Sequence, residues 1–141
     1  MNVDSIQNGV VIDHITAGSG MRLYNLLGLD ETDLSVAIIR NVVSRKMGKK
    51  DIIKIDADIP VNLDVIGYVD PGATVNIIKD GLLAEKKTID MPVLLTDVIK
   101  CKNPRCITGV EQELKHVFKL TDRAAKEYRC IYCETKAEDR R

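Results

Sequence analysis

The hydrophobic residues at the start of the chain form first a β-branched run and then an apolar stripe near helical spacing. Residues 9–15 (GVVIDHI) are rich in β-branched side chains, which predicts a strand. Residues 19–27 carry apolar side chains near helical spacing, with Ser19 as a possible N-cap and Gly28 as the stop. One strand followed by one helix is therefore expected here.

Two further strands are predicted next. Residues 34–43 (LSVAIIRNVV) carry apolar side chains at both odd and even positions, so both faces of a strand formed by them would be apolar. This pattern suits a strand that is buried on two sides or lies at a subunit contact, although the run could also be ordinary core. Residues 51–56 (DIIKID) predict a shorter strand. The residues between them, 44–50 (SRKMGKK), are expected to form a basic loop.

A second helix and a hairpin complete this part of the chain. Residues 60–69 have an apolar stripe at helical spacing that ends at the turn sequence Asp70-Pro71-Gly72. The runs 73–79 and 82–89 flank Asp80-Gly81, which is typical of a type I′ hairpin in which both central residues have positive φ. The order β-α-β-β-α-β-β predicts a ferredoxin-like α+β sandwich with one added strand.

All four cysteines lie between residues 101 and 133, in the pattern Cys101-x4-Cys106 and Cys130-x2-Cys133. Each pair of cysteines, with the few residues between them, forms a short turn that we call a knuckle, and each knuckle presents two sulfurs to one ion. Residues 111–120 alternate between polar and apolar, which predicts antiparallel strands that bring the knuckles together. We expect a small all-β, zinc-ribbon-like domain that holds one tetrahedral Zn²⁺.

A zinc ion with four thiolate ligands is structural, because a catalytic zinc normally keeps one position open for water. Two alternatives are iron in the same all-sulfur site, which thiolates also accept, and reduced buried cysteines without a metal. The second is disfavoured, because about 41 residues with little aromatic content supply too small an apolar core without a metal.

The charges exclude one class of protein. Lys plus Arg and Asp plus Glu both total 21, so there is no overall basic field of the kind that a nonspecific nucleic-acid or membrane-surface binder needs. Before Val98 there are 10 basic and 14 acidic residues; from Val98 onward there are 11 and 7. Four thiolates that bind one divalent ion add net negative charge, which leaves the residues from Val98 onward only mildly basic.

The composition also indicates what the core consists of. Hydrophobic residues reach 45% and aromatic residues only 4%, so the core is expected to consist of Val, Ile and Leu.

The compartment follows from the N-terminal residues and the cysteines. The first nine residues lack the basic flank and apolar core of a signal peptide, and no apolar run approaches the ~18 residues of a membrane span. We therefore expect a cytoplasmic protein with no membrane partner. In a reducing compartment cysteines are more often metal ligands than disulfides. The sequence contains no recognisable nucleophile–base pair and no Gly-rich phosphate loop, so no motif in it indicates catalysis.

Five segments occur in a specific order along the chain: 11–15 (VIDHI), 48–55 (GKKDIIKI), 73–76 (ATVN), 101–107 (CKNPRCI) and 130–134 (CIYCE). Together they resemble the regulatory chain of aspartate carbamoyltransferase over essentially the whole sequence. The resemblance implies a non-catalytic subunit of pyrimidine biosynthesis. Residues 1–97 would form an allosteric domain that binds nucleotide effectors such as CTP and ATP and pairs with a second regulatory chain through a shared sheet.

Residues 98–141 would, by the same resemblance, bind zinc and dock on the catalytic chains, linking catalytic trimers. The contacts that it implies lie on the two cysteine knuckles: Asn103, Arg105, Tyr132 and Glu134. Side chains that a metal holds rigidly are well placed to dominate an interface.

The implied nucleotide site can be given chemical roles. A triphosphate needs cations, which lysines on predicted strands or strand ends supply: Lys50, Lys54, Lys86 and Lys87. His14 could donate to phosphate and Asp13 could accept from ribose hydroxyls, although adjacent strand residues normally point to opposite faces. Asn76 offers an amide to the edge of a base. The other expected contacts are Val3, Asp4, Ile6, Ile52, Ile78 and Leu83.

The hairpin register bears on two of these lysines. A regular Asp80-Gly81 hairpin places Leu83 and Lys87 on the face of Asn76, whereas ungapped register with the family favours Lys86. A β-bulge would reconcile the two alternatives.

A zinc-ribbon nucleic-acid-binding module with an α+β partner domain is the second hypothesis. It draws on the basic residues of the four-cysteine part: Lys100, Lys102, Arg105, Lys115, Lys119, Arg123, Lys126 and Arg129. The near-neutral charge with metal bound and the few aromatic residues for base stacking disfavour it. We therefore expect no nucleic-acid partner.

Overall fold

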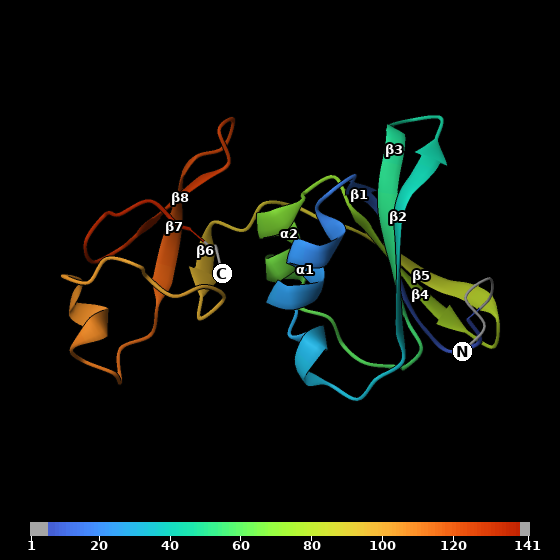
Figure 1. Cartoon of the computed structure of the whole chain (residues 1–141), viewed down its shortest axis with the longest axis horizontal. Coiled ribbons are helices and arrows are strands. Elements are labelled where there is room, and N and C mark those ends of the chain that lie inside the picture. The colour runs from blue at the N-terminus through green and yellow to red at the C-terminus, as the bar shows by residue number, and fades with distance from the viewer. Residues whose placement is uncertain (1–5, 139–141) are drawn as a thin grey trace. The chain divides into compact units, whose positions relative to one another are not determined.

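The computed structural model describes residues 6–138 (Figure 1). The chain divides into two compact units, Met1–Asp90 and Met91–Arg141. The division predicted between residues 97 and 98 falls inside the second unit, because a short strand that the hydrophobic pattern does not reveal, β6 (Leu94–Thr96), pairs within that unit. Among the described residues, no helix has the length and apolar character needed to cross a membrane.

The first unit contains a five-stranded antiparallel sheet with the strand order β2-β3-β1-β4-β5. Its elements are β1 (Gly9–Thr16), α1 (Gly20–Leu26), the 3-10 helix η1 (Leu29–Glu31), β2 (Val36–Ser44), β3 (Gly48–Ile55), α2 (Leu63–Val69), β4 (Thr74–Lys79) and β5 (Leu82–Thr88). Both α-helices lie on the same side of this sheet (Figure 1). The predicted ferredoxin-like α+β sandwich is confirmed, and β5 is the added strand.

Aliphatic side chains between the sheet and the helices form the core of the first unit. Ile12 in β1 lies opposite Ile53 in β3 and Val75 in β4, and all three side chains are fully buried. Leu23 of α1 and Ile66 of α2 are fully buried as well. Because side chains alternate along a strand, the residues next to these point to the sheet face that the helices leave open.

The buried carboxylate of Asp51 fixes the start of α1. Ser19 is the N-cap residue, as predicted, but its side chain makes no capping hydrogen bond. Instead, Asp51 Oδ2 accepts hydrogen bonds from the backbone N–H groups of Gly18 and Gly20, both at 3.0 Å. Asp51 Oδ1 accepts from Asn41 N in β2, also at 3.0 Å. One carboxylate thus joins β3, α1 and β2.

The second helix begins later than predicted. The pattern predicts a helix over residues 60–69, but α2 starts at Leu63, after the N-cap residue Asn62. Asn62 Oδ1 accepts hydrogen bonds from Asp64 N and Val65 N, at 3.0 and 3.3 Å. This side-chain cap sets the boundary, because it satisfies N–H groups that have no partner within the helix.

Two tight turns join neighbouring strands of the sheet. Asp80 and Gly81 have φ angles of 51° and 76°, which confirms the predicted type I′ hairpin between β4 and β5. The basic loop predicted over residues 44–50 is too long, because β3 begins at Gly48 and pairs with β2 from its first residue. The turn is confined to residues 45–47.

The second unit is a small three-stranded antiparallel sheet in the order β6-β7-β8, with β7 at Val117–Asp122 and β8 at Glu127–Cys130. Phe118 and Tyr128 are almost fully buried, and the Tyr128 hydroxyl donates a hydrogen bond to Pro92 O at 2.6 Å. The predicted all-β character is confirmed.

The strand predicted over residues 111–120 is wrong in its first half. A 3-10 helix, η2 (Ile107–Gly109), follows the first knuckle, and the chain continues in turns up to β7. Glu111 N donates to Ile107 O at 2.8 Å, and Leu114 N donates to Glu111 O at 3.1 Å. These local bonds satisfy the backbone groups that a strand would have paired across a sheet.

Candidate functional site

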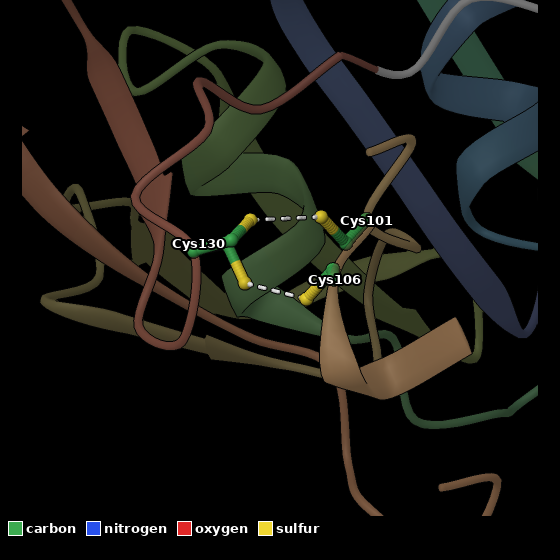
Figure 2. Close-up of side chains that lie close together, drawn as sticks. Cys101, Cys106 and Cys130 are labelled. Atoms are coloured by element: carbon green, nitrogen blue, oxygen red, sulfur yellow. Dashed lines mark hydrogen bonds between the residues drawn. The ribbon is translucent and has the colours of Figure 1, made fainter. Parts of the chain in front are cut away.

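Four cysteine sulfur atoms converge in the second unit (Figure 2). All four Sγ atoms lie within 4.8 Å of one another. Cys101 Sγ is 3.5 Å from Cys133 Sγ, and Cys106 Sγ is 3.7 Å from Cys130 Sγ, so each of these contacts joins one knuckle to the other. Tetrahedral coordination with bonds of about 2.3 Å places sulfurs about 3.8 Å apart. The four cysteines are therefore positioned to bind one metal ion.

The surroundings of the sulfurs shift their acidity in opposite directions. Hydrogen bonding by Thr108, whose hydroxyl donates to Cys106 Sγ at 3.1 Å, lowers the pKa of the Cys106 thiol. Burial raises the pKa of Cys133, but hydrogen bonds, chiefly with Thr135, outweigh it and lower that pKa to about 6. Burial raises the pKa of Cys101 to about 12. Because thiolates are the form that binds metal, ion binding releases the remaining protons.

The first unit carries an open pocket of about 410 Å³ on the sheet face away from the helices. Its lining comes from the N-terminal segment, β1, β3, β4 and the β4–β5 turn: Ile6, Val11, Asp13, Ile52, Lys54, Ile78 and Gly81. Apart from Val11 and Gly81, all of them are among the residues predicted to contact nucleotide. The structure therefore brings this part of the predicted set together.

The strand register explains why these side chains meet. Val11 in β1 lies opposite Lys54 in β3 and opposite Asn76 in β4. Asn76 in turn lies opposite Lys86 in β5. Directly opposed residues share a face of the sheet. Two lysines and one amide thus form a single row across four strands, on the face that carries the pocket.

A β-bulge separates Asp13 from His14. The pairing of β1 with β3 shifts register here, and His14 has a φ of 59°. His14 Nδ1 lies 3.0 Å from Thr74 Oγ1, and His14 does not line the pocket. Asp13 lies 3.0 Å from Lys50 Nζ. Burial raises the pKa of Asp13, but the hydrogen bond from Lys50 and the backbone N–H of His14 outweigh it and hold that pKa below its usual value.

The β4–β5 hairpin contains a bulge. Ile77 lies opposite Glu85, whereas the next residue, Ile78, lies opposite Leu83. Ala84 is therefore the extra residue in β5. Leu83 lies on the same face as Ile78, as predicted.

This bulge decides between the two neighbouring lysines. Lys86 lies opposite Asn76, whereas Lys87 lies opposite the buried Val75. Lys87 is therefore on the other face, and the regular-hairpin count that placed it beside Asn76 is wrong.

The N-terminal segment also contributes to the pocket. Ile6 is buried and lines it, whereas the predicted contacts Val3 and Asp4 lie outside the described residues. Gly81 N donates a hydrogen bond to Gln7 O at 2.9 Å, which holds this segment against the hairpin turn.

Two lining residues, Val11 and Gly81, were not among the predicted contacts. Val11 stands next to Asp13 at the same parity of a strand, so period-2 alternation was the signal that could have found it. Gly81 has no such signal, because its place depends on the N-terminal segment folding back onto the turn.

The residues predicted to dock on catalytic chains lie on or beside the cysteine knuckles. Asn103 Oδ1 accepts a hydrogen bond from Arg105 N at 3.0 Å, and Asn103 Nδ2 donates to Thr135 Oγ1 at 3.2 Å. The side chains of Arg105, Tyr132 and Glu134 are exposed. Hydrogen bonds of Asn103 thus connect the first knuckle with a residue that follows the second one, and the two knuckles carry side chains that a partner can reach.

The sequence matches two family models in tandem. Residues 1–90 match the model described as aspartate carbamoyltransferase regulatory chain, allosteric domain. Residues 94–141 match the one described as aspartate carbamoyltransferase regulatory chain, metal binding domain. The second match contains all four converging cysteines.

Curated relatives named aspartate carbamoyltransferase regulatory chain match over nearly the whole length. The protein from Clostridium tetani (strain Massachusetts / E88) is 47% identical over 135 residues, which cover 95% of this chain and 94% of the relative. The protein from Bifidobacterium longum (strain NCC 2705) is 42% identical over 138 residues, covering 98% and 99%. The chain therefore belongs to the family of aspartate carbamoyltransferase regulatory chains, and its role is regulatory rather than catalytic.

Proposed function

We propose that the chain binds nucleotide effectors, CTP and ATP, in its first unit and transmits their binding to catalytic trimers of aspartate carbamoyltransferase, controlling pyrimidine biosynthesis. The pocket on the open sheet face is the observation that supports this most directly. It combines an apolar wall with one lysine, Lys54, and lies beside an amide in the same cross-strand row. A nucleotide requires these features for its base and its phosphates.

The phosphates are assigned to the lysines of this face. Lys54 lines the pocket, and Lys86 lies in the same row beyond Asn76. Lys50 is held at the pocket edge by its ion pair with Asp13. His14, at the bulge, is assigned a further phosphate contact. Lysines suit this role because an ammonium acts as a point charge toward phosphate oxygens.

The base and ribose are assigned to the polar and apolar groups between the lysines. The Asn76 amide has both donor and acceptor groups, so it can read the edge of a base. Aliphatic side chains form the wall beside it: Ile6, Ile52, Ile78 and Leu83. Asp13 accepts from a ribose hydroxyl, since its lowered pKa keeps it ionised.

We assign one structural Zn²⁺ to the four cysteines. Four sulfur ligands fill a tetrahedron and leave no position for water, so the ion would supply folding energy rather than chemistry. It would also hold the knuckles that carry Arg105, Tyr132 and Glu134, through which the second unit docks on the catalytic chain. Two regulatory chains, paired through their first units, would link two catalytic trimers.

Calorimetric titration of the full chain with CTP and ATP tests the effector site. Lys54→Ala removes a charge-assisted contact to phosphate, so it should weaken binding by about 1.5 to 3 kcal/mol, more than the loss of a neutral hydrogen bond. Lys79→Ala is the matched control, because Lys79 is exposed on β4 and does not line the pocket. Equal affinities for wild type and Lys54→Ala, or no binding of either nucleotide by wild type, would remove the site from this face.

A further inference from the structure

The chain turns sharply between β6 and the first cysteine of the metal site. Thr96, the last residue of β6, lies opposite Val117, the first residue of β7. Asp97 follows with a φ of 56°, in the left-handed region that residues other than glycine seldom adopt. This conformation ends the extended strand, so the chain leaves the sheet after Thr96 and then reaches Cys101.

The residue before β7, His116, binds both ends of this connection. Its main chain holds Asp97, because Asp97 N donates to His116 O at 2.8 Å and His116 N donates to Asp97 Oδ1 at 2.9 Å. Its ring holds Cys101, because Cys101 N donates to His116 Nδ1 at 3.1 Å. The side chain of Ile99, between these two ends, is buried. His116 therefore closes the loop 97–101, whose last residue is a candidate metal ligand.

The bond to Cys101 determines which ring nitrogen of His116 carries the proton. A backbone N–H group can only donate, so Nδ1 must present its lone pair to Cys101 N. In the neutral imidazole the proton then lies on Nε2. His116 thus acts on Cys101 as a hydrogen-bond acceptor, and another acceptor at the same place in the side chain could replace it.

The next residue, Val117, contacts the other knuckle. Ile131 N, between the two cysteines of the second knuckle, donates to Val117 O at 3.0 Å. Two adjacent residues at the start of β7 therefore hold the backbone of one knuckle each. Cys101 Sγ and Cys133 Sγ, which come from different knuckles, lie 3.5 Å apart. The separation of the sulfurs is thus set by the backbone as well as by an ion.

We propose that His116 is a positioning residue of the metal site, whose Nδ1 holds the backbone of Cys101 so that its sulfur meets the other three. The inference rests on the metal ion in the proposed function and adds a residue outside the four cysteines. Loss of the groups that orient metal ligands typically weakens metal affinity about 10- to 100-fold. Thr108 and Thr135 contact sulfurs directly, whereas His116 acts on the main chain of a ligand. It therefore decides where the Cys101 sulfur lies.

The zinc affinity of the full chain, measured by competition with a chromophoric chelator, tests this role. His116→Leu keeps a side chain of comparable size but removes the acceptor, so the dissociation constant for Zn²⁺ should rise about 10- to 100-fold. His116→Asn should bind zinc nearly as wild type does, because its Oδ1 is an acceptor as many bonds from the backbone as Nδ1. Lys115→Leu, at the exposed neighbouring position, is the control and should keep the wild-type affinity.

A second measurement separates positioning from a general loss of stability. In His116→Leu saturated with Co²⁺, a displaced Cys101 sulfur should weaken the thiolate-to-cobalt absorption bands. Cys101 should also be the first cysteine to be alkylated, which peptide mass spectrometry can localise. A second unit that is only less stable would show the wild-type cobalt spectrum at saturation, and its four cysteines would be alkylated alike.

The inference is overturned if His116→Leu binds zinc with wild-type affinity, or if its saturated cobalt spectrum equals that of wild type. If His116→Leu does not fold even with excess metal, His116→Asn decides. Wild-type zinc affinity in His116→Asn supports the acceptor role, whereas a loss of about tenfold or more overturns it. A wild-type chain that binds no metal would instead overturn the proposed metal site itself.

Discussion

The two units of this chain are stabilised by different means. In the first, fully buried aliphatic side chains of three strands pack against two helices, as at Ile12 and Ile66. In the second, a three-stranded sheet has few large buried side chains, chiefly Phe118, Tyr128 and Leu95, and four cysteine sulfurs converge beside it. Apolar burial can fold the first unit by itself, whereas a unit as small as the second normally needs a metal or a disulfide.

The same difference decides where each unit can meet a partner. Because both helices of the first unit cover one sheet face, the opposite face is left for a ligand. In the second unit the exposed side chains predicted to dock, such as Arg105 and Tyr132, are carried by the cysteine knuckles. Loss of metal should therefore remove the docking surface and leave the pocket intact.

The largest effect is expected when the metal is lost. Cys130→Ser, or a strong chelator, should unfold residues 91–141 while the first unit keeps its structure. The apparent binding free energy of a structural zinc is on the order of 10 kcal/mol, which exceeds the stability of so small a unit. Amide spectra of the labelled chain, recorded with its zinc content, measure both units at once.

The control for this substitution is Ile131→Ser, which changes an exposed residue of the same knuckle and keeps all four sulfurs. It should retain zinc and the native amide spectrum. A metal-free chain whose second unit still shows that spectrum would contradict the contrast between the two units.

The fold was predictable from the sequence wherever one local signal determined it. The Asp80-Gly81 turn and the β-branched run of β1 are local signals, and both were interpreted correctly. The start of α1 was predicted, but its cap was not, because Asp51 is supplied by a strand far away in the sequence. Strand β6 was missed, since three residues carry too short a pattern.

The candidate sites follow the same rule. The four ligands of the metal site could be predicted, because sulfur spacing within each knuckle is local. The pocket depends on which strands become neighbours, and the bulge at Ala84 shifts every later pair of β5. For that reason the sequence left Lys86 and Lys87 undecided, and only the register separates them.

An intermediate effect is expected from the polar group that ties the first unit together. Asp51→Asn replaces one acceptor oxygen with an N–H group that faces backbone donors. The first unit should lose about 1 to 3 kcal/mol of stability in urea denaturation, because buried donors are left without acceptors. Glu85→Gln, at an exposed position of β5, is the control and should change little. Zinc content should stay at the wild-type level in both variants, and its loss in Asp51→Asn would mean that the two units are not independent.

The smallest effect should come from the ion pair at the pocket edge. The folded state lowers the pKa of Asp13, so its ionised form stabilises the first unit above about pH 4, and this stabilisation is lost as the pH falls through the folded pKa. In Asp13→Asn nothing titrates at this position. The stability difference between wild type and variant should therefore shrink between pH 5 and pH 3, when it is followed through amide signals of the first unit.

The size of this difference separates a surface pair from a buried one. The side chains of Asp13 and Lys50 keep 21% and 16% of their exposure, so solvent screens their attraction and the effect should stay below that of Asp51→Asn. Lys50→Met removes the cation and should abolish most of the pH-dependent part. A pH-dependent part that persists undiminished in Lys50→Met would mean that Lys50 does not stabilise the ionised carboxylate. In that case Asp13 would be held by the backbone N–H of His14 alone, and Lys50 would be available to phosphate without first breaking an ion pair.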